Sequence, residues 1–233
     1  MGENNKKTSA ASGHSSEAVC RFMGLDLLLA PGVLVPRGET ELLARSAIDI
    51  LRTLEAPLVV DMCCGSGNLA AAIAHHCPKA RVWAADLTDD TTALARRNVE
   101  RLGLSERVTV RQGDLFASLA QDRLDGTVDV VVCNPPYIST SALESEKASL
   151  LDSEPREAFD GGPYGISILQ RLVKEALGVL KPGGWLLFEF GEGQHKLVAS
   201  LLARSKSYGA ISFAETDGTP RVAIAKRLAG VQT

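Results

Sequence analysis

Short apolar runs alternate along this chain with stretches in which apolar residues recur at helical spacing. Runs that are apolar almost throughout are typical of strands covered on both faces. Strand–helix alternation of this kind predicts an α/β fold, with a parallel sheet that carries helices on both faces. The predicted strands are residues 58–62, 81–86, 108–111, 128–133, 185–190, 211–216 and 221–226.

The last two strands are separated by Asp217-Gly218-Thr219-Pro220, which predicts a C-terminal antiparallel hairpin. Residues 25–35 alternate weakly and predict a second hairpin, around Pro31-Gly32. The first residues are polar and typical of a disordered tail. We therefore expect a tail at 1–17, a short hairpin or arm at 18–38 and one domain at 39–233. The predicted helices are residues 39–54, 67–76, 89–102 and 166–180.

Composition argues against several classes of protein. No apolar stretch is long enough to span a bilayer, and the polar N-terminus does not have the pattern of a signal peptide, so we expect no membrane association and a cytoplasmic location. The net charge is −3, with no basic excess of the kind that grips a nucleic-acid backbone. The five cysteines include no Cys-x-x-Cys pair, which predicts reduced thiols and no metal site.

A glycine-rich turn, Asp61-Met62-Cys63-Cys64-Gly65-Ser66-Gly67, follows the first predicted strand. Its glycines let the backbone approach a ligand closely, next to the free N–H groups at a helix N-terminus. Asp86 lies nineteen residues beyond Gly67, at the end of the second strand. A carboxylate in this place can accept hydrogen bonds from both ribose hydroxyls of an adenosine-type ligand.

Two cofactors fit this pattern. Gly65 to Ala70 satisfies the dinucleotide pattern Gly-x-Gly-x-x-Gly/Ala, which keeps NAD open. However, no strand-end His or Lys is placed for hydride chemistry, and Gly113-Asp114-Leu115-Phe116 follows the third strand. Asp114 can accept a hydrogen bond from an adenine amino group while Leu115 packs on the ring, which favours S-adenosyl-L-methionine. Asp114 also suits the N-cap of a following helix.

Asn134-Pro135-Pro136-Tyr137 directly follows the fourth predicted strand. The prolines stop the strand and hold an extended turn at its carboxyl end. The Asn134 side-chain oxygen and a neighbouring carbonyl can accept both hydrogen bonds of one NH2 group, while Tyr137 covers a flat substrate. Such a site would hold a planar nitrogen during group transfer. A proline-terminated loop with an Asn cap is the structural alternative.

In their order and spacing, the motifs of this chain resemble those of the HemK/PrmC protein-glutamine N5-methyltransferases. The resemblance implies a Rossmann-like class I methyltransferase domain with a mostly parallel seven-stranded sheet and the C-terminal antiparallel hairpin. The motifs that carry it are Pro36-Arg37-Gly38-Glu39-Thr40-Glu41, Gly65-Ser66-Gly67, Gly113-Asp114-Leu115-Phe116, Asn134-Pro135-Pro136-Tyr137-Ile138, Glu154-Pro155-Arg156-Glu157-Ala158 with Gly161-Gly162, Leu180-Lys181-Pro182-Gly183-Gly184 and Pro220-Arg221-Val222.

The family implies methyl transfer from S-adenosyl-L-methionine to a glutamine side chain of a peptide-release factor, with S-adenosyl-L-homocysteine as product. By this resemblance the catalytic residues would be Asn134, Pro135 and Tyr137. The predicted cofactor-binding residues are Asp61, Cys63, Gly65, Ser66, Gly67, Asp86, Leu87, Asp114, Leu115 and Asn134. The predicted substrate-binding residues are Pro36, Arg37, Glu39, Thr40, Pro136, Tyr137, Glu154 and Tyr164.

Departures from the family keep a second acceptor class open. About 35 residues precede the Pro-Arg motif, where family members usually carry a helical substrate-docking domain. Cys63 stands where a first glycine is common, Gly38 replaces a proline, and Tyr164 stands where an Asp is usual. A small-molecule amide, amidine or nitrogen heterocycle is therefore an alternative acceptor to a protein glutamine.

Two other classes of function fit less well. An adenine-N6 nucleic-acid methyltransferase would need a basic groove around a flipped base, which the charge balance does not favour. A non-catalytic binding module would be expected to have lost the Asn134–Tyr137 loop. Elsewhere, Glu154 and Arg156 are predicted either to form a surface ion pair or to lie over the substrate, and Glu189 to be a buried, hydrogen-bonded acid.

Overall fold

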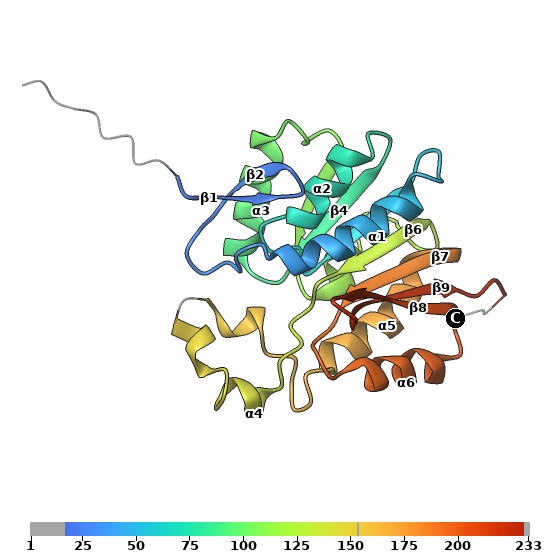
Figure 1. The fold of residues 1–233 in the computed structure, drawn as a ribbon. Helices are drawn as coiled ribbons and strands as arrows, with labels where there is room; N and C mark the ends of the chain where they lie inside the picture. The colour runs from blue at the N-terminus through green and yellow to red at the C-terminus, as the bar shows by residue number, and fades with distance from the viewer. Residues whose placement is uncertain (1–16, 153, 231–233) are drawn as a thin grey trace, which may run out of the picture.

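The computed structural model describes residues 17–152 and 154–230 (Figure 1). The predicted tail at residues 1–17 lies outside the described residues, apart from Glu17. Among the helices in the described part of the chain, none is both long and apolar enough to cross a membrane.

A seven-stranded sheet forms the centre of the molecule, as predicted. Its strand order is β5-β4-β3-β6-β7-β9-β8. The pairs from β5 to β7 are all parallel, whereas β9 pairs antiparallel with both β7 and β8. The strands are β3 (Leu58–Met62), β4 (Arg81–Asp86), β5 (Val108–Gln112), β6 (Val128–Cys133), β7 (Leu180–Glu189), β8 (Tyr208–Thr216) and β9 (Thr219–Arg227).

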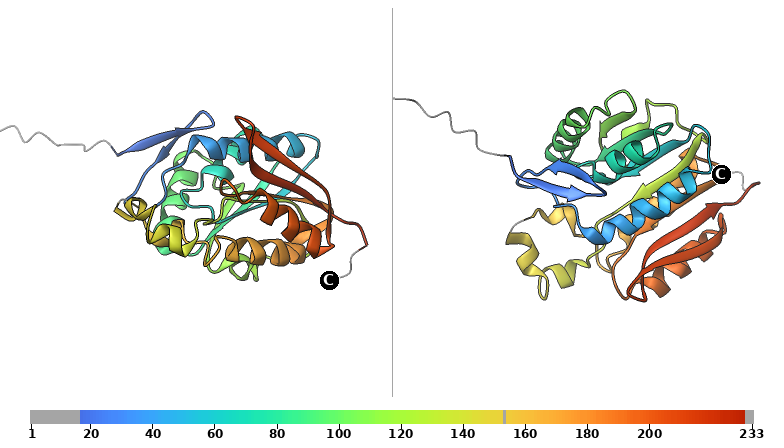
Figure 2. Two further views of the ribbon diagram at one scale, coloured as in Figure 1. Left: turned by 60° about the horizontal axis from the view of Figure 1, so that its bottom comes forward. Right: turned by 45° about the horizontal axis from the view of Figure 1, so that its top comes forward.

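Helices cover both faces of the sheet (Figure 2). Alternation along each strand divides the core: Val130 and Val132 pack with α1, α2 and α3, whereas Val131 and Cys133 pack with α5 and α6. The helices are α1 (Glu41–Leu51), α2 (Asn68–His76), α3 (Asp89–Arg101), α4 (Thr140–Leu143), α5 (Ser167–Val179) and α6 (His195–Ser205). Four 3-10 turns are η1 (Gly38–Thr40), η2 (Leu115–Leu119), η3 (Ala148–Asp152) and η4 (Arg156–Ala158). The sequence did not predict α6.

The N-terminal hairpin turns at a different place from the one predicted. Strands β1 (Val19–Phe22) and β2 (Leu25–Leu28) pair antiparallel across Met23-Gly24, not around Pro31-Gly32. Met23 has φ 49° and Gly24 has φ 84°. Positive φ at both turn residues gives a backbone twist that matches paired strands, and Gly24 adopts it without steric strain.

Strand β7 begins five residues earlier than predicted. Val128 pairs with Leu180 and Val130 with Trp185, so Lys181-Pro182-Gly183-Gly184 forms a bulge within the strand. A Cβ on Gly184 would lie 3.0 Å from the Val128 carbonyl oxygen, a tight contact that favours glycine at this position. Helix α5 ends at Val179 and β7 begins at Leu180, so the prolyl-glycyl segment lies within the strand and not between the helix and the strand.

The order in which strands are added to the sheet reverses between β3 and β6. From β3 the chain continues outward to β4 and β5, then crosses back to place β6 on the other side of β3. In open α/β sheets, ligands bind outside the carboxyl ends of the strands at such a switch point. The glycine-rich turn after β3 and the Asn134–Tyr137 loop after β6 therefore lie side by side.

Asn98 on α3 connects this edge to the N-terminal hairpin. Its side chain is fully buried, accepts a hydrogen bond from Leu28 N (2.7 Å), and donates to Leu28 O (3.3 Å) and Ser66 O (2.9 Å). One amide thus links α3, the hairpin and the glycine-rich turn.

We expect Asn98→Ala to lower the free energy of unfolding by roughly 2–4 kcal/mol, because it leaves buried backbone groups of Leu28 and Ser66 without partners. Glu100→Ala, an exposed position on the same helix, should change it by less than about 0.5 kcal/mol. Urea unfolding of the three proteins measures the difference. Equal stability of the two variants would contradict the linking role of Asn98.

Asp61 supports the glycine-rich turn from beneath. The residue is fully buried, and its Oδ2 accepts a hydrogen bond from Ala70 N (2.9 Å) in the first turn of α2. Burial raises the pKa of Asp61 from 3.8 to about 8, against the opposing effect of the Ala70 hydrogen bond. The folded state therefore favours the protonated carboxyl group.

Asp61 makes the stability of the fold depend on pH. The stability that protonated Asp61 contributes is present below pH 3.8 and is lost as pH rises to about 8. Asp61→Asn keeps an acceptor for Ala70 N but cannot ionise. Its stability relative to wild type should rise with pH by up to about 1.4 kcal/mol per unit. Urea unfolding between pH 5 and 9 measures this slope, with Asn98→Ala as the non-ionisable control; parallel curves for Asp61→Asn and wild type would refute it.

Candidate functional site

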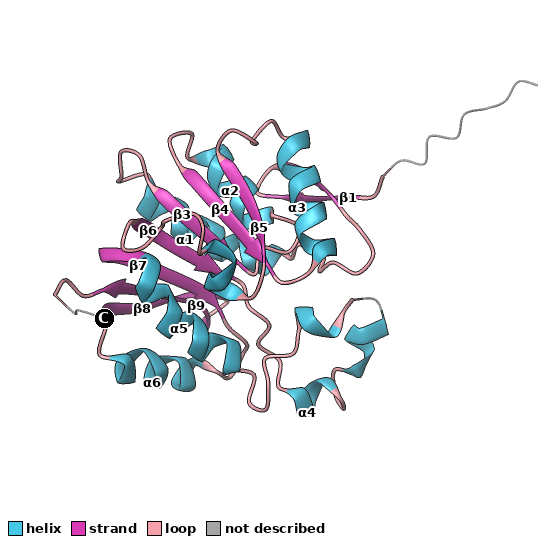
Figure 3. Ribbon diagram, turned by 180° about the vertical axis from the view of Figure 1, so that it is seen from behind, coloured by secondary structure: helices cyan, strands magenta, loops and turns pink. Residues whose placement is uncertain are grey.

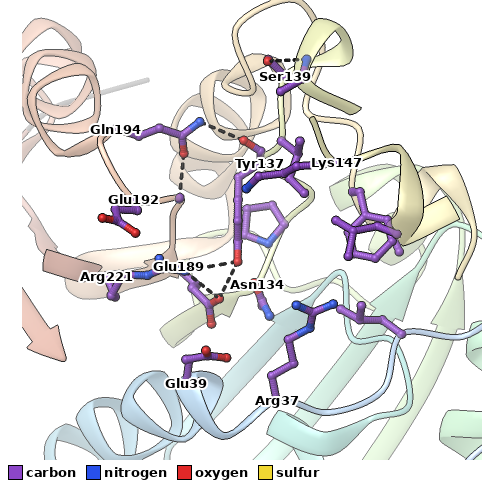
Figure 4. Close-up of a pocket in the computed structure, with 18 of the residues that line it drawn as sticks. Arg37, Glu39, Asn134, Tyr137, Ser139, Lys147, Glu189, Glu192, Gln194 and Arg221 are labelled. Atoms are coloured by element: carbon purple, nitrogen blue, oxygen red, sulfur yellow. Dashed lines mark hydrogen bonds and ion pairs between the residues drawn. The ribbon is translucent and has the colours of Figure 1, made fainter. Parts of the chain in front are cut away.

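Two cavities meet at Asn134. One, here called the glycine-loop cavity, has a volume of about 360 Å³ and lies over the turn after β3. The other, here called the tyrosine cavity, has a volume of about 550 Å³ and lies over the loop after β6 (Figure 4). Asn134 lines both, together with Leu34 and Ala158. A group held in one cavity could therefore be passed to a group held in the other.

Most of the predicted cofactor residues line the glycine-loop cavity. Asp86 lies at its edge, where Oδ2 accepts a hydrogen bond from Gly65 N and Oδ1 one from Leu87 N, each at 2.7 Å. Predicted cofactor residues in this wall are Cys63, Gly65, Asp86, Leu87, Asp114, Leu115 and Asn134. The structure also places Pro136, predicted to contact substrate, in this cavity.

Three predicted cofactor residues do not line this cavity. Asp61 is fully buried and Ser66 is 1% exposed, while Gly67 caps the N-terminus of α2 with φ 77°. A Cβ on Gly67 would lie 3.2 Å from Ala95 Cβ, so α3 packs directly against this glycine. In the structure these three residues support the turn from below, and half-buried Gly65 is the glycine of the turn that lines the cavity. Contact of Asp61, Ser66 and Gly67 with the cofactor stays a prediction.

Asp114 does not cap a helix. It occupies the N-cap position of η2 without a side-chain capping bond, and its Oδ1 accepts a hydrogen bond from Arg171 Nη1 on α5 at 2.9 Å. The N-cap alternative is therefore wrong. The carboxylate stays at the cavity wall, beside Leu115.

The tyrosine cavity contains the predicted catalytic loop. Asn134, Pro135 and Tyr137 line it, and so do Arg37, Glu39 and Tyr164 from the predicted substrate set. Pro36 and Thr40 instead border a separate small void of about 30 Å³. Sequence reasoning assigned no role in this cavity to several polar residues that the structure brings there: Lys147, Glu189, Glu192, Gln194 and Arg221.

A chain of hydrogen bonds supports Asn134 from behind. Asn134 Nδ2 donates to Thr40 Oγ1 (3.1 Å), and Thr40 Oγ1 donates to Glu189 Oε2 (2.9 Å). Thr40 is only 2% exposed and supports Asn134 from behind, while its contact with substrate stays a prediction. With its amino group engaged, Asn134 can present Oδ1 to the cavities as an acceptor.

Tyr137 is held on the same carboxylate. Its hydroxyl donates to Glu189 Oε1 (3.1 Å) and accepts from Arg221 Nη2 (3.3 Å). Burial raises the pKa of Tyr137 to about 12, reinforced by the negative charge of Glu189. The phenol therefore stays protonated at neutral pH, and its ring forms a neutral wall of the cavity (Figure 4). Glu189 is buried and hydrogen-bonded, as predicted.

The backbone of this loop is also fixed. Gln194 Nε2 donates to Tyr137 O (2.8 Å), and Gln194 Oε1 accepts from Gly191 N (2.7 Å). A Cβ on Gly165 would lie 2.2 Å from Tyr137 O, which explains the glycine at this tight crossing. No sequence periodicity marks Gln194, because it acts through a contact between distant loops.

Glu154 and Arg156 do not pair with each other in the way one alternative predicted. Glu154 accepts hydrogen bonds from Val35 N (2.9 Å) and Arg37 Nη2 (3.3 Å), so it joins the loop around η4 to the Pro-Arg segment. Arg156 pairs with Asp160 (3.1 Å) and Glu144 (3.4 Å), and it lines the glycine-loop cavity.

The sequence of this chain is similar to those of known methyltransferases. The sequence profile of the methyltransferase small domain family matches residues 37–157, which is more than half of the chain. A release factor glutamine methyltransferase of Moorella thermoacetica is 40% identical over 187 residues, covering 80% of this chain and 64% of that protein.

One further relative and one solved structure are also similar to this chain. The 4-amino-L-phenylalanine/4-methylamino-L-phenylalanine methyltransferase of Streptomyces pristinaespiralis is 39% identical over 203 residues, covering 85% of this chain and 66% of that protein. A crystal structure of a methyltransferase from Pyrococcus furiosus has a TM-score of 0.59 at 19% identity and covers 88% of this chain and 90% of that one, which shows the fold alone.

The chain spans about two thirds of the length of the curated relatives that it matches. Over this length the predicted motifs, the seven-stranded sheet and the family profile coincide. The chain therefore belongs to the methyltransferase family that contains the release factor glutamine methyltransferases, as the resemblance of its motifs to HemK/PrmC proteins predicted.

Proposed function

We propose that this chain transfers a methyl group from S-adenosyl-L-methionine to the side-chain amide nitrogen of a glutamine in a protein, as the names of its relatives describe for them. The position of Asn134 carries the proposal, because this residue borders both cavities and its amino group is bonded to Thr40, so that Oδ1 can serve as an acceptor at their junction. The glycine-loop cavity would hold the methyl donor and the tyrosine cavity the acceptor.

The residues of the glycine-loop cavity fit an adenosine-bearing donor. Asp86 would accept hydrogen bonds from ribose hydroxyls, and Asp114 one from the adenine amino group beside Leu115. Gly65 has φ 53°, and apart from its chain neighbours no described residue has an atom within 4 Å of where a Cβ would be. A side chain there would therefore extend into the open space that the ligand would occupy. When bound, S-adenosyl-L-methionine supplies a methyl group on a positively charged sulfur.

The tyrosine cavity suits a planar nitrogen. An amide nitrogen is a poor nucleophile because its lone pair is delocalised into the carbonyl group. Asn134 Oδ1 and the Pro135 carbonyl oxygen would accept hydrogen bonds from the two N–H groups of this amide. These bonds would orient the nitrogen and favour positive charge on it. Tyr137 would pack against the flat amide. The nitrogen–methyl bond would form as the sulfur–methyl bond breaks, and the nitrogen would then lose one proton to solvent. Because the proton leaves after the transfer, no strong base is required, and these residues contribute position and electrostatics.

A small aromatic amine is the second candidate acceptor. The relative from Streptomyces pristinaespiralis, named for such a substrate, is nearly as similar to this chain as the release factor enzyme. The tyrosine cavity, about 550 Å³, is larger than one glutamine side chain needs, and Phe159 and Tyr164 also line it. Nucleic acid remains a poor candidate for the acceptor, because the chain has no basic excess.

Acceptor class can be decided by label transfer. The protein is incubated with S-adenosyl-L-methionine carrying a tritiated methyl group, in separate reactions with a bacterial release factor and with 4-amino-L-phenylalanine. We expect label in the release factor, located at a glutamine by peptide mass spectrometry. Label in the amino acid alone would establish the second candidate, and label in neither would contradict both.

The substitution Asn134→Ala tests whether Asn134 orients the acceptor nitrogen. Loss of Oδ1 removes a hydrogen bond that orients the acceptor, so kcat should fall by about 10²–10³-fold. The dissociation constant of S-adenosyl-L-methionine, measured by calorimetry, should change by less than about fivefold. Glu215→Gln, an exposed position on β8, serves as the control. Unimpaired turnover in Asn134→Ala would remove Asn134 from the mechanism.

A further inference from the structure

Glu189 lies at the end of β7 beneath the junction of the two cavities. It is 3% exposed, and both carboxylate oxygens are occupied: Oε2 by the Thr40 hydroxyl at 2.9 Å and Oε1 by the Tyr137 hydroxyl at 3.1 Å. Cys133 of β6 pairs with Phe188 of β7, and the next residues along these two parallel strands are Asn134 and Glu189. The two side chains therefore start from neighbouring strand ends. The sequence predicted only a buried acid at this place.

The charge of Glu189 sets the direction of the hydrogen bonds above it. A carboxylate can only accept, so Thr40 must use its single hydroxyl proton to donate to Glu189. Thr40 then has only lone pairs left for Asn134, and Asn134 must turn its amino group toward Thr40. The amide oxygen of Asn134 is consequently left for the acceptor nitrogen.

Neutral Glu189 would remove this constraint. A protonated carboxyl group can donate to Thr40 Oγ1, which frees the Thr40 proton to bond the oxygen of Asn134. The amide could then turn over and present its NH2 group toward the NH2 group of the acceptor. Two donors facing each other repel and make no hydrogen bond.

We infer that Glu189 is a positioning residue, whose negative charge fixes through Thr40 which end of the Asn134 amide faces the acceptor. The inference rests on the proposed function for its effect on catalysis, whereas its effect on Asn134 concerns this chain alone. A merely structural buried acid would need hydrogen-bond partners but no particular charge, and a glutamine could replace it.

The surroundings of Glu189 determine the pH range in which this matters. Burial raises the pKa of Glu189 above its ordinary value, opposed by hydrogen bonds from Thr40 and Tyr137 and by the positive charge of Arg221, whose Nη2 lies 3.9 Å from Oε1. Glu39 on η1 adds a further raising effect. As pH falls, Glu189 should therefore become protonated at a higher pH than an exposed glutamate does. The fixed orientation of the Asn134 amide should be lost over the same pH range.

The first test observes Asn134 directly and needs no acceptor. In the full chain, NMR follows the side-chain amide resonances of Asn134 and the carboxyl carbon of Glu189 as pH is lowered. We expect the two to change with the same midpoint, and the Asn134 change to disappear in Glu189→Gln. Asn134 resonances that stay constant while Glu189 titrates would overturn the inference, whatever the acceptor is.

The second test measures catalysis on the acceptor that takes up label. Glu189→Gln should lower kcat by about 10–100-fold, the effect of misorienting one hydrogen-bonding group, with little change in the dissociation constant of S-adenosyl-L-methionine. Glu189→Asp, which keeps the charge, should retain more activity, and Glu215→Gln should retain all of it. Full activity in a folded Glu189→Gln would overturn the inference.

A double-mutant cycle separates orientation from general damage. If Glu189 acts through Thr40, the combined loss in Thr40→Val with Glu189→Gln should be close to that of one variant alone. Additive losses would show that the two residues act independently and would contradict the inference. Should Glu189→Gln fail to fold, the pH titration of the wild-type Asn134 resonances still decides the question.

Discussion

A carboxylate taken out of water has to be met by hydrogen-bond donors, and at Glu189 this requirement organises the site. The donors come from Thr40, 149 residues away along the chain, and from Tyr137, 52 residues away. Arg221 on β9 brings a positive charge within 3.9 Å. One buried charge therefore fixes the Pro-Arg segment, the loop after β6 and the C-terminal hairpin relative to each other.

The sheet supplies the frame on which this charge can act. Parallel pairing of β3 with β6 puts the glycine-rich turn next to Asn134, and pairing of β6 with β7 puts Asn134 next to Glu189. Both faces of these strands are covered by helices, so the strand ends are held firmly while the loops beyond them carry the polar groups (Figure 2). A methyltransferase from Pyrococcus furiosus has the same fold at only 19% identity, so very different sequences can form this sheet.

The wall of the tyrosine cavity is less regular. Figure 3 shows α4 and the short helices that follow it as a lobe beside the sheet. Lys147 reaches the cavity from this lobe, and Glu154 joins the lobe to Val35 and Arg37. Such a wall has no helical or strand periodicity, and its residues are brought together by contacts between loops.

Much of the architecture could be read from the chain, because its cause is local. Apolar runs of strand length predicted β3, β4 and β6 with their observed ends, and the Pro-Pro pair marked the end of β6. Motifs also predicted the family and placed Asp86, Asp114 and Asn134 at strand ends, where the structure has them lining cavities.

Tertiary structure alone decided which side chain faces which way. Within one continuous turn, Gly65 lines the cavity while Asp61 and Ser66 are buried beneath it. The hydrogen bond by which Thr40 supports Asn134 from behind was not predicted, and neither was any role for Arg221 or Gln194. Local sequence determines where strands and turns form because backbone preference and burial act over a few residues. The direction of a hydrogen bond depends on partners more than a hundred residues away, and only the folded chain brings these together.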